Sequence, residues 1–392
     1  MDFDKFIDRR GSLSAKWDSM EALYGVSPDD GIAMWVADTD FASPDCVQDA
    51  VRKMLEHGVY GYTGPDAENQ YRAAICWWME NRHGWTVDPA SIFTATGLGN
   101  GVGMVLDAYT DPGDSVVLFT PVYHSFARIT RAAGRNVIEC PMVNEGGRYR
   151  MEFDAYDALM DGTQKLVIFC SPHNPGGTVW TAEEQRQLVA FCRKHNLLLV
   201  SDEIHHDLVF EGHKHIPMPL AAPDCDDILI MLTAPSKTFN IAGTHTGNVI
   251  IPNAKLREAF ASRVLALNLS SNIFGVAMTT AAYSPEGAAW VDELVPYLNA
   301  NRIAFEDGMA KIPGVKPMRL QATYLSWIDF SDTGMSIGEI KSRINKTARI
   351  APNYGETFGL GGDTFMRFNL GTTRAVIDQA VERLQDAFSD LQ

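Results

Sequence analysis

Five short apolar segments recur along the middle of the chain, and longer amphipathic stretches separate them. They are SVVLF (115–119), KLVIFC (165–170), LLLVS (197–201), ILIML (228–232) and GNVII (247–251). Strands that are apolar throughout, rather than at every second position, are typical of a parallel sheet covered by helices on both faces. The pattern therefore predicts an α/β fold built around such a sheet.

Acidic side chains outnumber basic ones, 49 to 33, which gives a formal net charge of −16. A surface field of this sign repels nucleic-acid phosphates and anionic lipids, and no run of Lys or Arg offsets it. The sequence contains neither the ~18 consecutive apolar residues of a membrane-spanning helix nor the apolar N-terminal segment that directs secretion. We therefore expect a cytoplasmic protein that binds neither nucleic acid nor a membrane.

The pattern changes after about residue 285, which divides the chain into three parts. Residues 1–45 are irregular and are expected to form an N-terminal arm or part of a small domain. Residues 46–285 contain the apolar segments and form the expected large domain. Residues 286–392, in which helical stretches alternate with the segments TYLSWIDF and TFMRFNL, read as a smaller α+β domain.

Two helix starts are specific enough to name. Thr181 and Glu184 have the spacing of a capping box, which predicts a helix over 181–195. Ser43 followed by Pro44 predicts another helix, with Ser43 as its N-cap and Pro44 at its first position.

Polar residues follow four of the apolar segments directly, and a glycine-rich turn opens another helix. Ligands of open parallel sheets bind beyond the carboxyl ends of the strands, so these side chains are expected to lie together. The polar residues are Tyr123, Asn174, Asp202 and Lys237, and the turn is TGLGNG (96–101). This turn is neither a GxGxxG fingerprint nor a Walker loop, but its backbone N–H groups could hold a phosphate.

Pyridoxal phosphate is one cofactor that explains the whole set. It needs a lysine for its Schiff base, a cradle for its phosphate and a carboxylate facing its ring nitrogen. We expect Lys237 to form the Schiff base and later to remove the Cα proton of the substrate. Asp202 would keep the ring nitrogen protonated, and Asn174 would donate to the phenolate oxygen. The remaining expected contacts are stacking by Tyr123 and phosphate binding by Gly97, Leu98, Gly99 and Ser236.

Several longer motifs carry a resemblance to a known family. The segments YTGP (62–65), SPHNPGG (171–177), SDEIHHDLVF (201–210), TAPSKTFNIAG (233–243) and RFNLG (367–371) resemble those of fold-type I pyridoxal-phosphate enzymes, the class I/II aminotransferases. MWVADTDF (34–41), HGVYGYT (57–63) and GHKHIP (212–217) look like the MalY/PatB-type cystathionine β-lyases, a C–S lyase branch. The resemblance implies a mostly parallel seven-stranded sheet in the large domain, and a homodimer with a composite site.

The resemblance also implies roles for individual residues. Arg367 should bind the substrate α-carboxylate, because a guanidinium offers two parallel donors to a carboxylate, and the backbone near Val36 should close over the same group. Tyr62 would reach across the dimer to the cofactor phosphate, Tyr60 would line the substrate pocket, and His205 would lie at the cofactor. His245 occupies a position where many aminotransferases carry a phosphate-binding arginine, which favours the lyase branch.

Three functions remain open at this point. The first is a C–S β-lyase that cleaves L-cystathionine or a related cysteine S-conjugate to a thiol, pyruvate and ammonia. The second is an aminotransferase, and the third is a catalytically idle interaction protein. No metal site is expected, since the six cysteines are scattered and His205, His206, His213 and His215 lack a known ligand spacing.

Overall fold

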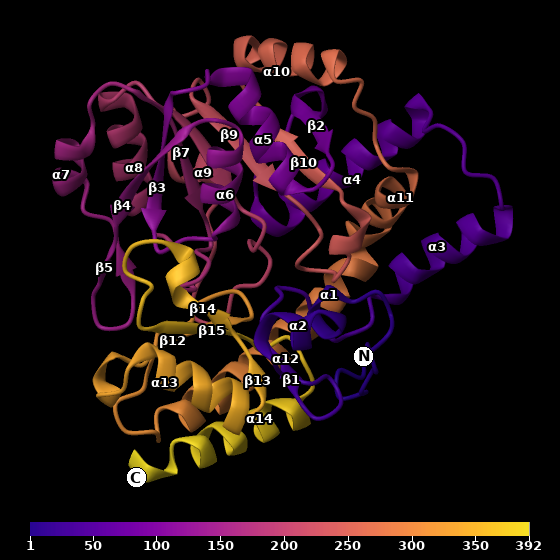
Figure 1. The fold of residues 1–392 in the computed structure, drawn as a ribbon. Coiled ribbons are helices and arrows are strands. Elements are labelled where there is room, and N and C mark those ends of the chain that lie inside the picture. The colour runs from indigo at the N-terminus through magenta and orange to yellow at the C-terminus, as the bar shows by residue number, and fades with distance from the viewer. Residues whose placement is uncertain (392) are drawn as a thin grey trace.

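The computed structural model describes residues 1–391 and contains a seven-stranded sheet at its centre (Figure 1). The strand order is β2 (Ile92–Ala95), β10 (Gly247–Ile250), β9 (Leu229–Thr233), β8 (Leu198–Asp202), β7 (Gln164–Cys170), β3 (Ser115–Thr120) and β4 (Asn136–Pro141). The pairs from β9 to β4 are all parallel. The expected α/β fold with a mostly parallel seven-stranded sheet is therefore confirmed.

One of the five apolar segments forms a strand that is antiparallel to its neighbours. Strand β10 is antiparallel to both of its neighbours, β2 and β9. Its residues are fully buried like those of the parallel strands, so its apolar pattern is the same. Because burial on both faces sets this pattern, the sequence does not reveal the direction of the strand.

Successive residues of each strand contribute to two different cores. In β3, Val116 and Leu118 pack into one cluster with α5 (Leu98–Tyr109) and α6 (Ser125–Ala132). Val117 and Phe119 point to the opposite face, whose cluster includes residues of α8 (Ala182–Lys194). Both faces of the sheet are thus covered, which explains why the strands are apolar at every position. Further helices around this sheet are α3 (Asp45–His57), α4 (Pro65–His83), α7 (Phe153–Tyr156), α9 (Met218–Ala221), α10 (Ala254–Ala266) and α11 (Ile273–Ala282).

The two predicted helix starts have different outcomes. Thr181 and Glu184 form the complete capping box at the start of α8. Helix α3, however, begins at Asp45, one residue later than predicted. Pro44 is its N-cap, with an extended backbone (φ −58°, ψ 152°), so Ser43 does not cap it.

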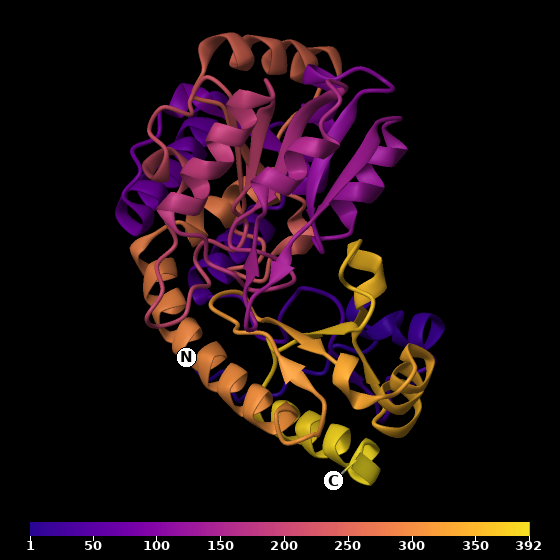
Figure 2. The same ribbon diagram turned by 90° about the vertical axis from the view of Figure 1, so that its left-hand side faces the viewer.

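The long helix α12 (Pro285–Met309) leads from the large sheet to a second, smaller sheet (Figure 2). That sheet is antiparallel, with the order β11 (Lys316–Pro317), β12 (Leu325–Asp329), β15 (Phe365–Asn369) and β14 (Asn353–Tyr354). Helices α13 (Ile337–Ser342) and α14 (Arg374–Ala387) belong to the same part of the chain. Among residues 1–391, no helix has both the length and the apolar character needed to cross a membrane.

The N-terminal residues lie against this smaller sheet region rather than in the large sheet. After the short helices α1 (Ala15–Asp18) and α2 (Met20–Tyr24), strand β1 (Ile32–Ala33) pairs in parallel with β13 (Ile350–Ala351). The segment that follows β1 crosses to the carboxyl edge of the large sheet, where Thr39 exchanges hydrogen bonds with the side chain of Asn240. This crossing brings residues 35–41 to the functional site.

Candidate active site

A cavity of about 170 Å³ lies at the carboxyl edge of the parallel strands. Nine of the ten residues predicted to bind the cofactor line it: Gly97, Leu98, Gly99, Tyr123, Asn174, Asp202, His205, Ser236 and Lys237. They come from the start of α5 and from the segments that follow β3, β7, β8 and β9. Parallel strands bring their carboxyl ends to one edge, which is why residues so distant in sequence meet here.

Lys237 is half-buried and lines this cavity, in the turn that follows β9. Its Nζ donates a hydrogen bond of 2.7 Å to the main-chain oxygen of Ala37. Burial lowers the pKa of Lys237, although Tyr123, Asp38 and Asp202 oppose that shift. A lowered pKa increases the fraction of neutral amine, which is the form that attacks an aldehyde.

Asp202 is the last residue of β8 and is 5 % exposed. Its Oδ1 accepts a hydrogen bond of 3.1 Å from the main-chain N–H of Ile204. Burial raises the pKa of Asp202 to about 7. A carboxyl group held this way gains stability from a cationic hydrogen-bond donor, and a protonated ring nitrogen is such a donor.

The glycine-rich turn forms the opposite end of the cavity. Gly97 is the N-cap of α5 and has a positive φ of 77°, a conformation that favours glycine. Because Gly97, Leu98 and Gly99 line the cavity, the start of α5 lies where helix N-termini bind phosphate. His245 lies beside this turn, because a Cβ built on Gly97 would be 4.0 Å from His245 Nδ1.

His205 and Asn174 occupy the wall between these ends. His205 is buried, and its Nδ1 finds no hydrogen-bond partner within residues 1–391. Burial holds the pKa of His205 well below its usual range, so the ring is neutral. The main-chain N–H of Asn174 donates to Cys170 Sγ over 3.4 Å. A buried polar atom without a partner, such as His205 Nδ1, indicates that a ligand supplies one.

Arg367 reaches the same cavity wall from β15 of the small sheet. Its Nη1 donates to Asn174 Oδ1 (2.9 Å), and its Nη2 donates to the main-chain oxygen of Trp35 (2.9 Å) and to Asn353 Oδ1. The guanidinium lies 5.0 Å from the centre of the Phe358 ring. Burial lowers the pKa of Arg367 to about 10, so it stays charged at neutral pH. Its buried Nε has no partner in the described part of the chain, which leaves one donor for an anion.

Residues 35–41 form a loop that is fixed at several main-chain oxygens. The oxygen of Val36 accepts from Asn369 Nδ2, and that of Ala37 accepts from Lys237 and from the hydroxyl of Tyr324 (3.0 Å). The sequence pattern pointed to the backbone near Val36 but to none of these donors. Asn369 and Tyr324 belong to the small sheet region, so only the folded chain shows their contact with the loop.

Two carboxylates of the same loop bind cations from the N-terminal arm, one of them buried and the other half-buried. Lys16 is fully buried, and its Nζ lies 3.0 Å from Asp40 Oδ2. Arg9 Nη1 lies 2.9 Å from both Asp38 Oδ1 and Asp40 Oδ1. Sequence reasoning missed all four residues. A charged N-terminal segment normally reads as a solvated surface, so no signal in the sequence distinguishes Lys16 from an exposed lysine.

Tyr60 and Tyr62 do not line the cavity of their own chain. Tyr62 is fully exposed, and Tyr60 packs at 5.4 Å against the ring of Phe274. Both lie in the loop that joins α3 to α4. Their predicted roles at the phosphate and in the substrate pocket therefore require a second subunit.

The residues of the cavity fit pyridoxal phosphate. Lys237 offers an amine of lowered pKa, Asp202 a buried carboxyl group with a raised pKa, and the start of α5 a row of N–H groups for a phosphate. Together with the seven-stranded sheet, this set defines a pyridoxal-phosphate enzyme of fold type I.

Comparison with known proteins agrees with this class. The model of the family "Aminotransferase class I and II" matches residues 32–384. The chain is 39 % identical to cystathionine β-lyase PatB of Bacillus subtilis over 99 % of this chain and 100 % of that one, and 29 % identical to protein MalY of Escherichia coli over 98 % of each. Its structure matches cystalysin of Treponema denticola, which contains pyridoxal 5'-phosphate, with a TM-score of 0.94 and 33 % identity over 100 % of this chain and 99 % of that one.

The chain belongs to the class I and II aminotransferase family, in its MalY/PatB branch. It is a pyridoxal-phosphate-dependent enzyme of the C–S β-lyase type.

Proposed function

We propose that the enzyme cleaves L-cystathionine or a related cysteine S-conjugate. With one water molecule, the products are a thiol, pyruvate and ammonia. The observation that carries the proposal is the placement of Lys237 Nζ in one cavity with Asp202, close to the Arg367–Asn174 pair. The names of its relatives PatB and cystalysin support a sulfur-containing substrate.

Each residue of the site has a separate role in this reaction. Arg367 binds the α-carboxylate of the amino acid, with Nε as its free donor. Lys237 removes the proton from Cα, for which the neutral amine favoured by burial is suited. When bound, pyridoxal phosphate supplies an aldehyde that condenses with amines and a ring that accepts the electrons released at Cα. Asp202 would hold the proton on the ring nitrogen of the bound cofactor. The Cβ–S bond of the substrate would break with its electron pair on sulfur, which takes up a proton to give the thiol.

The decisive experiment is turnover of L-cystathionine by purified holoenzyme without any 2-oxo acid. A lyase releases pyruvate and thiol continuously in equal amounts. An aminotransferase instead converts its cofactor once and stops until a 2-oxo acid is added. L-Homoserine serves as the matched amino acid without sulfur, and continuous pyruvate release from cystathionine alone is expected. A stop after one equivalent would favour the aminotransferase. Absence of any cofactor-dependent conversion of cystathionine or other cysteine conjugates would favour the idle protein.

We also propose that the enzyme acts as a cytoplasmic homodimer whose site is completed by Tyr62 of a second copy. Exposed apolar side chains around the α3–α4 loop support this proposal: Leu55, Val59, Tyr60 and Tyr62. Light scattering coupled to gel filtration tests the assembly. Tyr62→Phe should weaken binding of the cofactor without changing the oligomeric state.

We propose the following division of the chain into domains. Residues 46–285 form the cofactor-binding domain, and residues 286–392 with the arm 1–45 form the small domain. The pairing of β1 with β13 supports the placement of the arm. In limited proteolysis, the arm should stay attached to the fragment that contains β13.

A further inference from the structure

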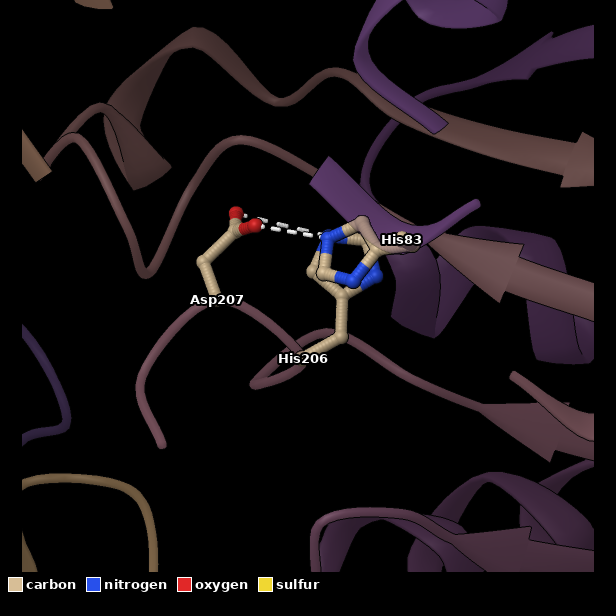
Figure 3. Close-up of side chains that lie close together, drawn as sticks. All are labelled: His83, His206 and Asp207. Carbon is tan, nitrogen blue, oxygen red and sulfur yellow. Dashed lines mark hydrogen bonds and ion pairs between the residues drawn. The ribbon is translucent and has the colours of Figure 1, made fainter. Parts of the chain in front are cut away.

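Behind the wall formed by Asp202 and His205 lies a buried group of three imidazoles and two carboxylates, here called the histidine cluster: His83, His206, His215, Glu203 and Asp207. His83 is the last residue of α4, and Glu203 to Asp207 follow β8. Figure 3 shows the rings of His83 and His206 one over the other, both facing the carboxylate of Asp207. Their ring centres are 4.2 Å apart. The reaction described above uses none of these five side chains.

Both carboxylates already accept several hydrogen bonds. Asp207 Oδ1 accepts from Trp78 Nε1 (3.0 Å) and His83 Nε2 (2.8 Å), and its Oδ2 accepts from Thr238 Oγ1 (2.8 Å). These donors stabilise the ionised form, so Asp207 carries a negative charge in the protein interior.

Glu203 is held in the same way. Its Oε1 accepts from Ser201 Oγ (2.9 Å) and from the main-chain N–H of Met218 (3.0 Å), and its Oε2 accepts from His215 Nε2 (2.7 Å). The cluster therefore buries two carboxyl groups close together, and a buried carboxylate is costly unless hydrogen-bond donors and a nearby cation compensate its charge.

His206 is the group placed to supply that cation. His83 and His215 each donate one N–H to a carboxylate, which a neutral imidazole can do. His206 is fully buried, and neither of its nitrogens makes a hydrogen bond to any residue from 1 to 391. Its Nε2 lies 3.4 Å from Asp207 Oδ2, and one of its nitrogens lies within 4.8 Å of Glu203. The negative charges of Asp207 and Glu203 outweigh burial and raise the pKa of His206, whereas Arg82 on α4 opposes the shift.

Two parts of the active site depend on this cluster. Glu203 is the neighbour of Asp202 in the chain, and His205 in the cavity wall is the neighbour of His206. Asp207 holds the hydroxyl of Thr238, the neighbour of Lys237. The cluster thus connects the segment that follows β8 to the turn after β9, which carries Lys237.

We propose that His206 is a positioning residue: as a buried imidazolium between Glu203 and Asp207, it holds the segments that carry Asp202 and Lys237 in the geometry that binds the cofactor. A protonated His206 also favours the ionised form of Asp202, because it opposes burial and the neighbouring Glu203, both of which raise the pKa of Asp202. The inference rests on the cofactor assignment and is independent of the identity of the sulfur substrate.

A bound metal ion is the competing explanation, because His83, His206 and Asp207, as well as Glu203, His206 and His215, have their ligand atoms close together. The spacing favours hydrogen bonds. Ligands around one tetrahedral zinc lie about 3.3 Å apart, whereas His83 to Asp207 and His215 to Glu203 are 2.8 and 2.7 Å. A metal is therefore an outcome of the test rather than the proposal.

The test compares His206→Gln with His213→Gln, an exposed histidine nearby in the chain. The dissociation constant of pyridoxal phosphate and the unfolding midpoint of the cofactor-free protein are measured from pH 5.5 to 8.5. We expect His206→Gln to weaken cofactor binding about tenfold at pH 6. Its loss of thermal stability should be largest below pH 6.5 and should shrink as the pH rises, because a raised pKa stabilises the fold only while His206 is protonated. His213→Gln should match the wild type in both measurements.

Unchanged cofactor affinity, or a stability loss that is the same at every pH, would overturn the proposal. About one zinc per chain in the wild type, absent from His206→Gln, would replace it with a metal site. If His206→Gln does not fold, nitrogen NMR of wild-type protein with labelled histidines decides. The proposal requires one buried histidine that is cationic at pH 7, and a fully neutral set refutes it. Lyase turnover in the same wild-type preparation keeps this result separate from the choice of substrate.

Discussion

Arg367 Nη1 donates to Asn174 Oδ1 over 2.9 Å, which joins the small sheet to the segment that follows β7 of the large sheet. Because the amide oxygen accepts from Arg367, the amide nitrogen is the end of Asn174 left to donate. This orientation suits an acceptor such as the phenolate oxygen of the cofactor. A residue assigned to the substrate carboxylate thus also orients a residue assigned to the cofactor.

Replacement of Arg367 should therefore affect both ligands. Arg367→Lys keeps the charge but loses the free Nε donor and the contact with Phe358, so kcat/KM should fall by about 10- to 100-fold, mainly through KM. Binding of the cofactor should weaken as well, measurable by titration of the cofactor-free protein. Arg128→Lys, on an exposed residue of α6, is the control and should change neither value. A normal KM in Arg367→Lys would contradict the carboxylate assignment.

Lys237→Ala removes the amine that we propose binds the cofactor covalently and takes the Cα proton. Turnover should fall by about 10³-fold or more, in line with the loss of a general base and a covalent anchor. After reduction with borohydride, mass spectrometry should find the cofactor on the peptide that contains residue 237 in the wild type and in the exposed control Lys214→Ala. Labelling of another lysine in the wild type would refute the assignment.

The raised pKa of Asp202 predicts a pH dependence of the cofactor-free protein. The unfolded chain loses the Asp202 proton near pH 4, but the folded chain keeps it to about pH 7. The contribution of this group to stability therefore decreases as the pH rises from 4 to 7. Asp202→Asn resembles the neutral form and should be more stable than the wild type by about 4 kcal/mol above pH 7.

Chemical denaturation of both cofactor-free proteins at pH 5 and pH 8 measures this difference. Addition of pyridoxal phosphate should reverse the order, because Asp202→Asn cannot pair with a protonated ring nitrogen. If the difference in stability between Asp202→Asn and the wild type is the same at pH 5 and pH 8, Asp202 is ionised in the empty site at both pH values.

The buried pair of Lys16 and Asp40 predicts that the N-terminal arm contributes to stability. Asp40→Asn leaves Lys16 without its nearest carboxylate and should reduce the free energy of unfolding by about 3 kcal/mol at pH 7. Burial alone would raise the pKa of Asp40, but Lys16 and Arg9 lower it. The advantage of the wild type should therefore shrink as the pH falls below about 4. Asp29→Asn, which changes an exposed carboxylate, should have little effect in the same urea titration.

The part of the site that sequence reasoning could predict is the part that lies at strand ends. Tyr123, Asn174, Asp202 and Lys237 each follow an apolar segment, and a parallel sheet brings such positions to one edge without further information. The direction of β10 was not visible, because burial on both faces gives the same pattern in either direction. Asn353 was missed for a related reason. It lies opposite Arg367 in the pairing of β14 with β15, and the sequence of either strand alone does not determine the register of that pairing.

The contacts of Val36 and Ala37 with the rest of the site were also invisible, since they join residues 200 or more positions apart. Lys237 meets Ala37, and Asn369 meets Val36, only because the segment after β1 crosses between the two sheets. Of the histidine cluster, the sequence analysis named only His206 and His215. The inclusion of His83 and the pairing with Glu203 and Asp207 depend on how α4 and the loop before α9 pack behind the site.

The pairing of β1 with β13 has a consequence for folding of the chain during its synthesis on the ribosome. Strand β1 leaves the exit tunnel early, while its partner at Ile350 and Ala351 is added some three hundred residues later. At about 5–20 residues per second, the wait is roughly 15 to 60 s. During that interval Ile32 and Met34 lack their final cover, so the nascent chain offers a hydrophobic stretch to chaperones.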